Sequence, residues 1–128
     1  MTKRHAGKGA TQRQLRVGEM IRHVLAGILM REEIADPDLT AQNVTVTEVK
    51  LSPDLRHATV FVRPFGAGDA EKLVAALKRH HRYLRGELAK HIEVKFMPDL
   101  VFRIDESFDE ADRIDALLRS PDVARDLD

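Results

Sequence analysis

Residues 71–91 carry the most regular hydrophobic pattern of the chain. At about 100° per residue, four leucines fall on one narrow stripe of a helix: Leu73, Leu77, Leu84 and Leu88. The stripe is interrupted only where His80 and His81 straddle it. This pattern predicts two short helices that meet at a kink.

Basic side chains occupy the opposite side of this predicted helix pair. They are Lys78, Arg79, Arg82 and Arg85. Three small residues, Ala75, Gly86 and Ala89, lie among them, so that a bulky polyanion can approach the backbone closely. The alternative interpretation is an ordinary core helix with a solvated basic face.

Another amphipathic helix is predicted to begin at Gln12. Thr11 and Gln14 have the spacing of a capping box, in which each side chain bonds the other residue's backbone N–H. Its apolar stripe consists of Val17, Ile21, Val24, Leu25 and Ile28. Arg13 and Arg16 lie in the first turns, outside the centre of that stripe. We expect the helix to end at Asp36, because the residue before a proline is pushed out of the α region.

Alternating and β-branched residues predict three strands. Residues 43–51 and 57–65 form a hairpin, joined by a turn at 52–55. The alternation slips at Thr47–Glu48, which indicates a β-bulge. Residues 92–104 form a third strand, bent or started afresh at Pro98.

The resulting order is α-β-β-α-kink-α-β, an α+β fold with helices on one face of a three-stranded sheet. We expect a flexible basic N-terminal arm over 1–10, one domain over 11–105 and an acidic segment over 106–128. A second capping box at Ser107–Glu110 would begin a weakly amphipathic helix in that last segment, which is partly helical or disordered.

The zero net charge of the 128 residues conceals a strong asymmetry. Residues 71–91 carry six Lys/Arg against two Asp/Glu, whereas residues 96–128 carry four against ten. Residues 1–35 carry seven Lys/Arg against three Asp/Glu. Two basic segments and an acidic tail are typical of a surface that binds an anionic polymer, with the tail on another face. With no cysteine, no apolar run behind the charged start and no run of membrane-spanning length, a cytoplasmic protein is expected.

The residues give little support to catalysis. His80 and His81 diverge by about 100° on a helix and cannot share a metal ion as residues four apart do. The aspartates between Asp105 and Asp115 lack the turn glycine and the ligand spacing of a calcium loop. Ser52 beside Asp54 has no positioned base, and a turn serine accounts for it better. We therefore expect no enzyme, no cofactor and no metal site.

Nucleic-acid binding agrees better with the pattern. In type II KH domains the same order of elements places a kinked helix pair across a three-stranded sheet, and the kink clamps a nucleic-acid backbone. Helix N-terminal amides after the kink, with cations and small residues around them, meet the physical requirement for binding phosphate.

At this point specific runs of residues carry a resemblance. The run from Asp36 to Leu39 and the run VTVTEVKLSPDLRHATVFV at 44–62 resemble the signature of ribosome-binding factor A, a family of bacterial ribosome-assembly proteins. Residues 76–105, with Leu84-Arg85 and Pro98-Asp99-Leu100, are similar to that family's second half. The resemblance covers roughly residues 13–118.

The resemblance implies a type II KH-like fold and a non-enzymatic role in late maturation of the small ribosomal subunit. It implies binding to free 30S subunits through 16S rRNA, support for processing of that rRNA at its 5′ end, and greatest importance in the cold. One departure concerns the family's alanine–x–glycine kink, which aligns here with His80-His81-Arg82. The kink is then either milder or makes its contacts through side chains.

The predicted RNA-binding residues are Arg13, Arg16, Lys78, Arg79, His80, His81, Arg82 and Arg85. The protein is expected to be a monomer without a small-molecule substrate. The alternative function is a protein-interaction module that docks on a basic partner through its acidic C-terminal segment.

Overall fold

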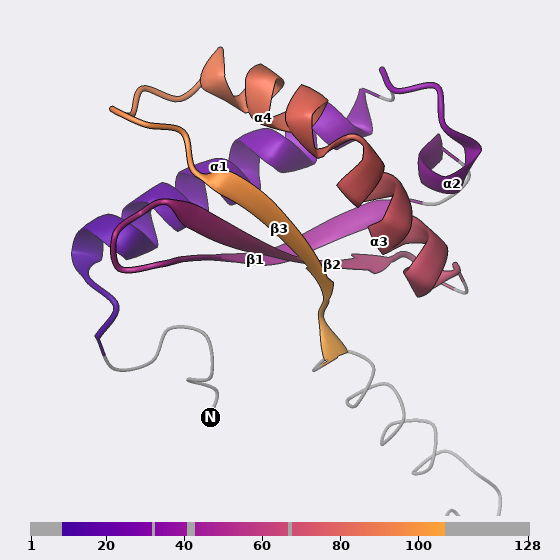
Figure 1. Ribbon diagram of the computed structural model, residues 1–128. Helices are drawn as coiled ribbons and strands as arrows, with labels where there is room; N and C mark the ends of the chain where they lie inside the picture. The colour runs from indigo at the N-terminus through magenta and orange to yellow at the C-terminus, as the bar shows by residue number, and fades with distance from the viewer. Residues whose placement is uncertain (1–8, 32, 41–42, 67, 107–128) are drawn as a thin grey trace, which may run out of the picture.

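The computed structural model of the protein has the predicted order of elements, with one additional short helix after the first helix (Figure 1). It describes residues 9–31, 33–40, 43–66 and 68–106. The helices and strands, in chain order, are α1 (Gln12–Met30), α2 (Pro37–Thr40), β1 (Val44–Leu51), β2 (His57–Pro64), α3 (Ala70–Arg79), α4 (His81–Ala89) and β3 (Asp99–Ile104). The predicted hairpin and the helix pair that follows it are confirmed.

The sheet has the order β1-β2-β3, with β3 at its edge. β1 and β2 are antiparallel, from Val44 opposite Pro64 to Leu51 opposite Ala58. β2 and β3 are parallel, which requires a long crossover between them. The helix pair α3–α4 forms that crossover and packs against β3, the strand that follows it in the chain.

The helices cover one face of the sheet (Figure 1). Alternate residues of the strands are buried beneath them, among them Val60, Val62 and Phe102. The leucine stripe of 71–91 faces the same core, since all four of its leucines are fully buried. In the part of the chain that the structure describes, no helix covers the other face of the sheet.

The predicted slip in β1 is a β-bulge between Val46 and Glu48. The Thr47 hydroxyl at the bulge donates a hydrogen bond to the carboxylate of Asp105, directly after β3, which is only 3% exposed. The Asp105 backbone N–H donates to the carbonyl of Val62, 2.9 Å away. These contacts link the bulge in β1, at one edge of the sheet, to the end of β3 at the other edge.

One sequence prediction about a boundary was wrong, and at a second boundary the structure selects one of two predicted alternatives. The first helix ends at Met30, not at Asp36, and the chain then turns so that Ile34 and Leu39 pack against the core. The third strand begins at Asp99, which agrees with the predicted alternative of a strand started afresh at Pro98 and not with one that runs from 92 and bends there. β2 starts at His57, which lies opposite Asp99, so the residues before Asp99 have no residue of β2 to pair with. The predicted helix over 107–118, the acidic segment beyond Glu106 and most of the basic arm lie outside the described residues.

Candidate nucleic-acid interface

The kink between α3 and α4 is a single residue, His80, whose φ of −105° and ψ of 18° interrupt the helical backbone. Its neighbour His81 places Nδ1 2.8 Å from the carbonyl oxygen of Lys78. A carbonyl can only accept, so Nδ1 carries the proton and donates. The imidazole therefore adds a side-chain donor to a carbonyl in the last turn of α3, where the regular helical hydrogen bonds end.

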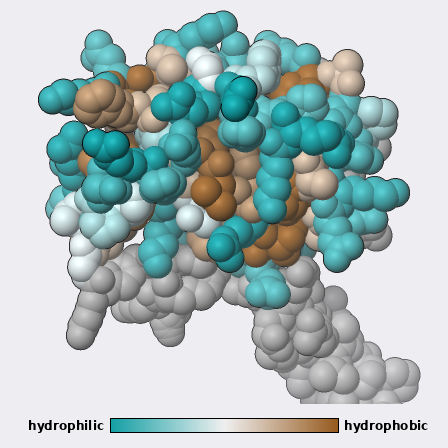
Figure 2. Space-filling model, viewed as in Figure 1, coloured by the Kyte–Doolittle hydropathy of each residue, from teal (hydrophilic) through white to brown (hydrophobic). Residues whose placement is uncertain are grey.

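A groove runs between this kinked pair and the edge strand β3. It consists of two neighbouring hollows of about 680 and 650 Å³, one beside α3 and one beside α4. Its floor is partly apolar and includes Val101, which is 37% exposed. Figure 2 shows hydrophobic atoms near the centre of the face that carries β3, with hydrophilic residues around them.

The charges of the groove differ between its two ends. Beside α3, Lys78 and Arg103 are balanced by Glu71 and Glu106. Beside α4, the lining residues are Arg82, Arg85, His57 and His81 with a single acid, Asp99. The end next to the kink is therefore the part best suited to an anion.

Arg85 also braces the start of β3. Its guanidinium donates to the backbone carbonyls of Met97 and Pro98 at 2.6 and 3.2 Å, and its Nε lies 3.5 Å from an Asp99 carboxylate oxygen. The side chain is still 43% exposed. It can thus hold the strand and present charge to the groove at once.

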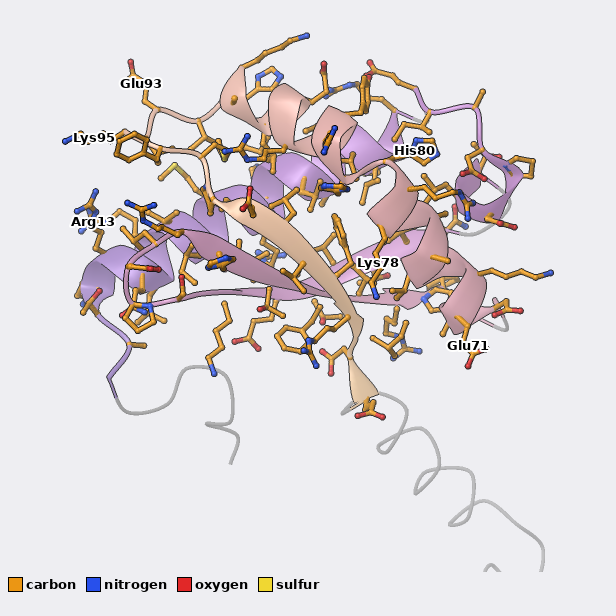
Figure 3. All side chains as sticks on the ribbon, viewed as in Figure 1. Arg13, Glu71, Lys78, His80, Glu93 and Lys95 are labelled. Atoms are coloured by element: carbon orange, nitrogen blue, oxygen red, sulfur yellow. The ribbon has the colours of Figure 1, made fainter. Side chains whose placement is uncertain are left out.

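Arg79 and His80 point away from the groove, toward α2. One terminal nitrogen of Arg79 lies 2.9 Å from Asp36 and 3.1 Å from Asp38, while His80 Nε2 lies 2.8 Å from Asp36. Figure 3 shows the two directions, with His80 turned to α2 and Lys78 to β3. The Arg79 guanidinium, followed by the His80 ring, lowers the pKa of Asp36 to about 2. Asp36 is therefore ionised near neutral pH and must be the acceptor from both.

Arg13 and Arg16 lie apart from the kink. They line a separate cleft between the start of α1, the β1–β2 turn and the linker from α4 to β3. Figure 3 shows Arg13 at the same end of the molecule as Lys95. The eight predicted RNA-binding residues thus fall into three sets: four on the groove, two facing α2 and two on this cleft.

The side chains that were considered for catalysis take part in structural contacts. The Ser52 hydroxyl donates to Asp54 at 2.7 Å and accepts from the backbone N–H of His57, which closes the β1–β2 turn. Within the described ranges, no group of three or more His, Asp or Glu side chains could hold a metal ion. No helix found among these residues has the length and apolarity to cross a membrane.

Comparison with known proteins identifies the family. The family model described as "Ribosome-binding factor A" matches residues 13–118. This chain belongs to the ribosome-binding factor A family. Ribosome-binding factor A of Maricaulis maris is 55% identical over 124 residues, which cover 97% of this chain and 88% of that protein.

Two solved structures agree with this assignment. The crystal structure of ribosome-binding factor A from Thermus thermophilus is 27% identical and superposes with a TM-score of 0.62, covering 71% of this chain and 93% of that one. A Thermus thermophilus homology model fitted into a cryo-EM map of a 30S–RbfA complex gives 27% identity and a TM-score of 0.57, covering 70% and 91%. The KH-like fold predicted from the sequence is confirmed.

Sequence reasoning missed two basic residues of the groove, His57 and Arg103. The alternation of β2 and β3 contained the signal. His57 comes directly before the buried Ala58, and Arg103 comes directly after the buried Phe102. Both side chains therefore point away from the core face of the sheet. Basic residues at such positions of two paired strands could have been added to the predicted surface.

Proposed function

We propose that this protein is a non-enzymatic assembly factor that binds free small ribosomal subunits as a monomer. The groove beside the kink lies against phosphates of 16S rRNA in this proposal. Membership in the ribosome-binding factor A family supports the ribosome as partner. The 30S complex of the Thermus thermophilus relative supports the small subunit.

The observation that carries the proposal is the cluster of cations on the kink end of the groove. Arg82 and Arg85 border a partly apolar hollow, with His57 and His81 beside them. Lys78 extends this set along α3. Phosphate contacts of this kind position a protein on RNA without reading its sequence, so that specificity comes from the folded shape of the subunit.

Arg79 and His80 have a secondary role in this proposal. Both already bind Asp36, so they contribute to RNA binding only when that contact breaks. Arg13 and Arg16 extend the surface from the other end of the molecule. The aligned family kink is replaced by larger side chains, and the contacts therefore come from side chains more than from bare backbone.

Sedimentation of the purified protein with free small subunits and with intact ribosomes tests the partner. The protein should co-sediment with free subunits and stay at the top of the gradient with intact ribosomes. Equal binding to both would contradict a role restricted to assembly. Failure to bind either one would remove the proposal.

Processing at the 5′ end of 16S rRNA is the proposed consequence of this binding. Cells that carry a variant with Lys78→Ala and Arg82→Ala should accumulate 5′-extended 16S precursor, most strongly in the cold, and primer extension measures its amount. Cells with Lys72→Ala and Arg22→Ala provide the matched control, since neither residue lines the groove. Normal 5′ ends in both strains would contradict the processing role.

A further inference from the structure

The cleft at the far end of the molecule is distinct from the groove. We name it the α1–linker cleft. Its lining residues come from α1, the β1–β2 turn and the α4–β3 linker, and its volume is about 480 Å³. That volume lies in the range of about 300–1,000 Å³ that is common for small-molecule sites.

Four cations surround the cleft: Arg13, Arg16, Arg56 and Lys95. Two acids, Asp54 and Glu93, line it as well, so cations are in excess. Within the part of the chain that the structure describes, no acidic side chain forms an ion pair with Arg13 or Arg16. As far as the described residues are concerned, their guanidinium groups can therefore pair with an external anion without first breaking an ion pair.

The walls between these charges are apolar and partly aromatic. Val17, Met20, Leu55 and Val94 contribute aliphatic surface. Phe96, also on the lining, is 69% exposed, and the ammonium group of Lys95 lies 5.7 Å from the centre of its ring. An exposed aromatic ring beside cations is the combination that stacks an unpaired base and pairs with its phosphate.

The turn that forms one wall is held rigidly. Leu55 adopts a left-handed conformation with a φ of 61°, which is costly for a branched aliphatic side chain. The Asp54 carboxylate accepts from the Ser52 hydroxyl and from the backbone N–H of Arg56. The carbonyl of Arg56 in turn accepts from the N–H of Asp99 at the start of β3. A wall fixed in this way needs little reorganisation when a ligand binds.

We propose that the α1–linker cleft binds a single unpaired nucleotide of an RNA strand. The base stacks on Phe96, the flanking phosphates pair with Arg16, Arg56 and Lys95, and Glu93 accepts hydrogen bonds from base amino groups. This inference rests on the proposed function for its RNA. It adds a site that holds an unstacked base, apart from the groove that holds phosphates.

Fluorescence anisotropy with a labelled single-stranded RNA hexamer tests the proposal. Phe96→Ala should weaken binding of the hexamer by about tenfold, because loss of one base–aromatic stack is costly. Phe96→Tyr keeps the ring and should restore affinity. Phe65→Ala is the matched control, since Phe65 is 72% exposed and does not line the cleft, and it should bind as the wild type does.

Amide chemical shifts distinguish the cleft from the groove. Titration of the ¹⁵N-labelled protein with the hexamer should shift the amides of 54–56 and 93–96. Adenosine monophosphate serves as the free-nucleotide arm and should bind more weakly than the hexamer. Equal affinity of the two ligands, or hexamer binding unaffected by Phe96→Ala, would overturn the assignment.

The two proposals fail separately. If the wild-type protein binds free subunits while Phe96→Ala and Phe65→Ala are indistinguishable on the hexamer, the cleft assignment is wrong and the proposed function stands. If the hexamer shifts the cleft amides in a Phe96-dependent way while free subunits do not bind, the cleft assignment survives without the ribosomal role.

Discussion

Asp36 Oδ2 lies 2.8 Å from Nε2 of His80, the residue at which the helix pair bends. The same oxygen accepts from Arg79 at 2.9 Å, and its side chain is only 11% exposed. Two residues that the sequence placed on a basic surface are therefore joined to an acid more than forty positions earlier in the chain. The contact holds the kink residue against Asp36 and turns Arg79 and His80 away from the groove.

This contact predicts an acid-sensitive part of the stability. The pKa of Asp36 falls from 3.8 to about 2 on folding, so its contribution is complete above the unfolded value and is lost as pH falls through about 2. Asp36→Asn should be less stable than the wild type near neutral pH and should lose less stability between about pH 4 and pH 2. Urea unfolding across that interval measures the difference. Parallel curves for the two proteins would contradict the pairing.

Removal of single arginines should separate the groove from the α2 contact. Arg82→Ala should reduce the slope of log affinity against log salt for free subunits by about 0.7–0.9, the value for one phosphate contact. Arg79→Ala should change it little, because Asp36 and Asp38 already bind Arg79. Asp36→Asn, which removes one of the two carboxylates that bind Arg79 and leaves Asp38, should steepen it. A larger loss from Arg79→Ala than from Arg82→Ala would contradict the orientation of these side chains.

The close contact of α1 with β1 predicts a costly glycine substitution. A Cβ at Gly18 would lie 2.5 Å from the backbone carbonyl oxygen of Val49, which cannot move without disturbing the strand. Gly18→Ala should therefore lower the free energy of unfolding by about 1–3 kcal/mol. Gly27→Ala, in the same helix with open space around it, should raise it by about 0.5–1 kcal/mol. Chemical denaturation of both variants measures this, and equal effects would exclude the close packing.

The hydrogen bond at the bulge predicts a second stability effect. Thr47→Val keeps the size of the side chain but leaves the buried Asp105 carboxylate without the Thr47 hydroxyl. We expect a loss of about 1–3 kcal/mol in the free energy of unfolding. Thr45→Val, at an exposed position of the same strand, is the control and should be nearly neutral. Similar stabilities of the two variants would show that the bulge does not need this bond.

Much of the fold could be predicted because the signals were local. The leucines of 71–91 are spaced for one buried stripe, and the histidines that break it mark the bend. The slip of alternation at Thr47 marks the bulge. The alternating Ile92, Val94 and Phe96 suggested a longer third strand. Alternation alone does not show whether the neighbouring strand extends far enough to pair with them.

The site was less predictable because its arrangement depends on distant segments. Nothing near Arg79 indicates that Asp36 will neutralise it. Arg56 and Lys95 are isolated basic residues in a turn and a linker, and only folding brings them beside Arg13 and Arg16. The basic residues of the sequence predicted a general surface, while the fold divided them among a groove, a contact with Asp36 and a cleft.

The salt dependence of binding to free small subunits tests the groove most directly. For about five phosphate contacts, the slope of log affinity against log salt should lie near −3.5 to −4.5. It should become shallower by about 1.4–1.8 for the variant with Lys78→Ala and Arg82→Ala, which removes two contacts. The Lys72→Ala and Arg22→Ala variant should keep the wild-type slope. A wild-type slope near zero, or the same slope in all three proteins, would contradict RNA binding through the groove beside the kink.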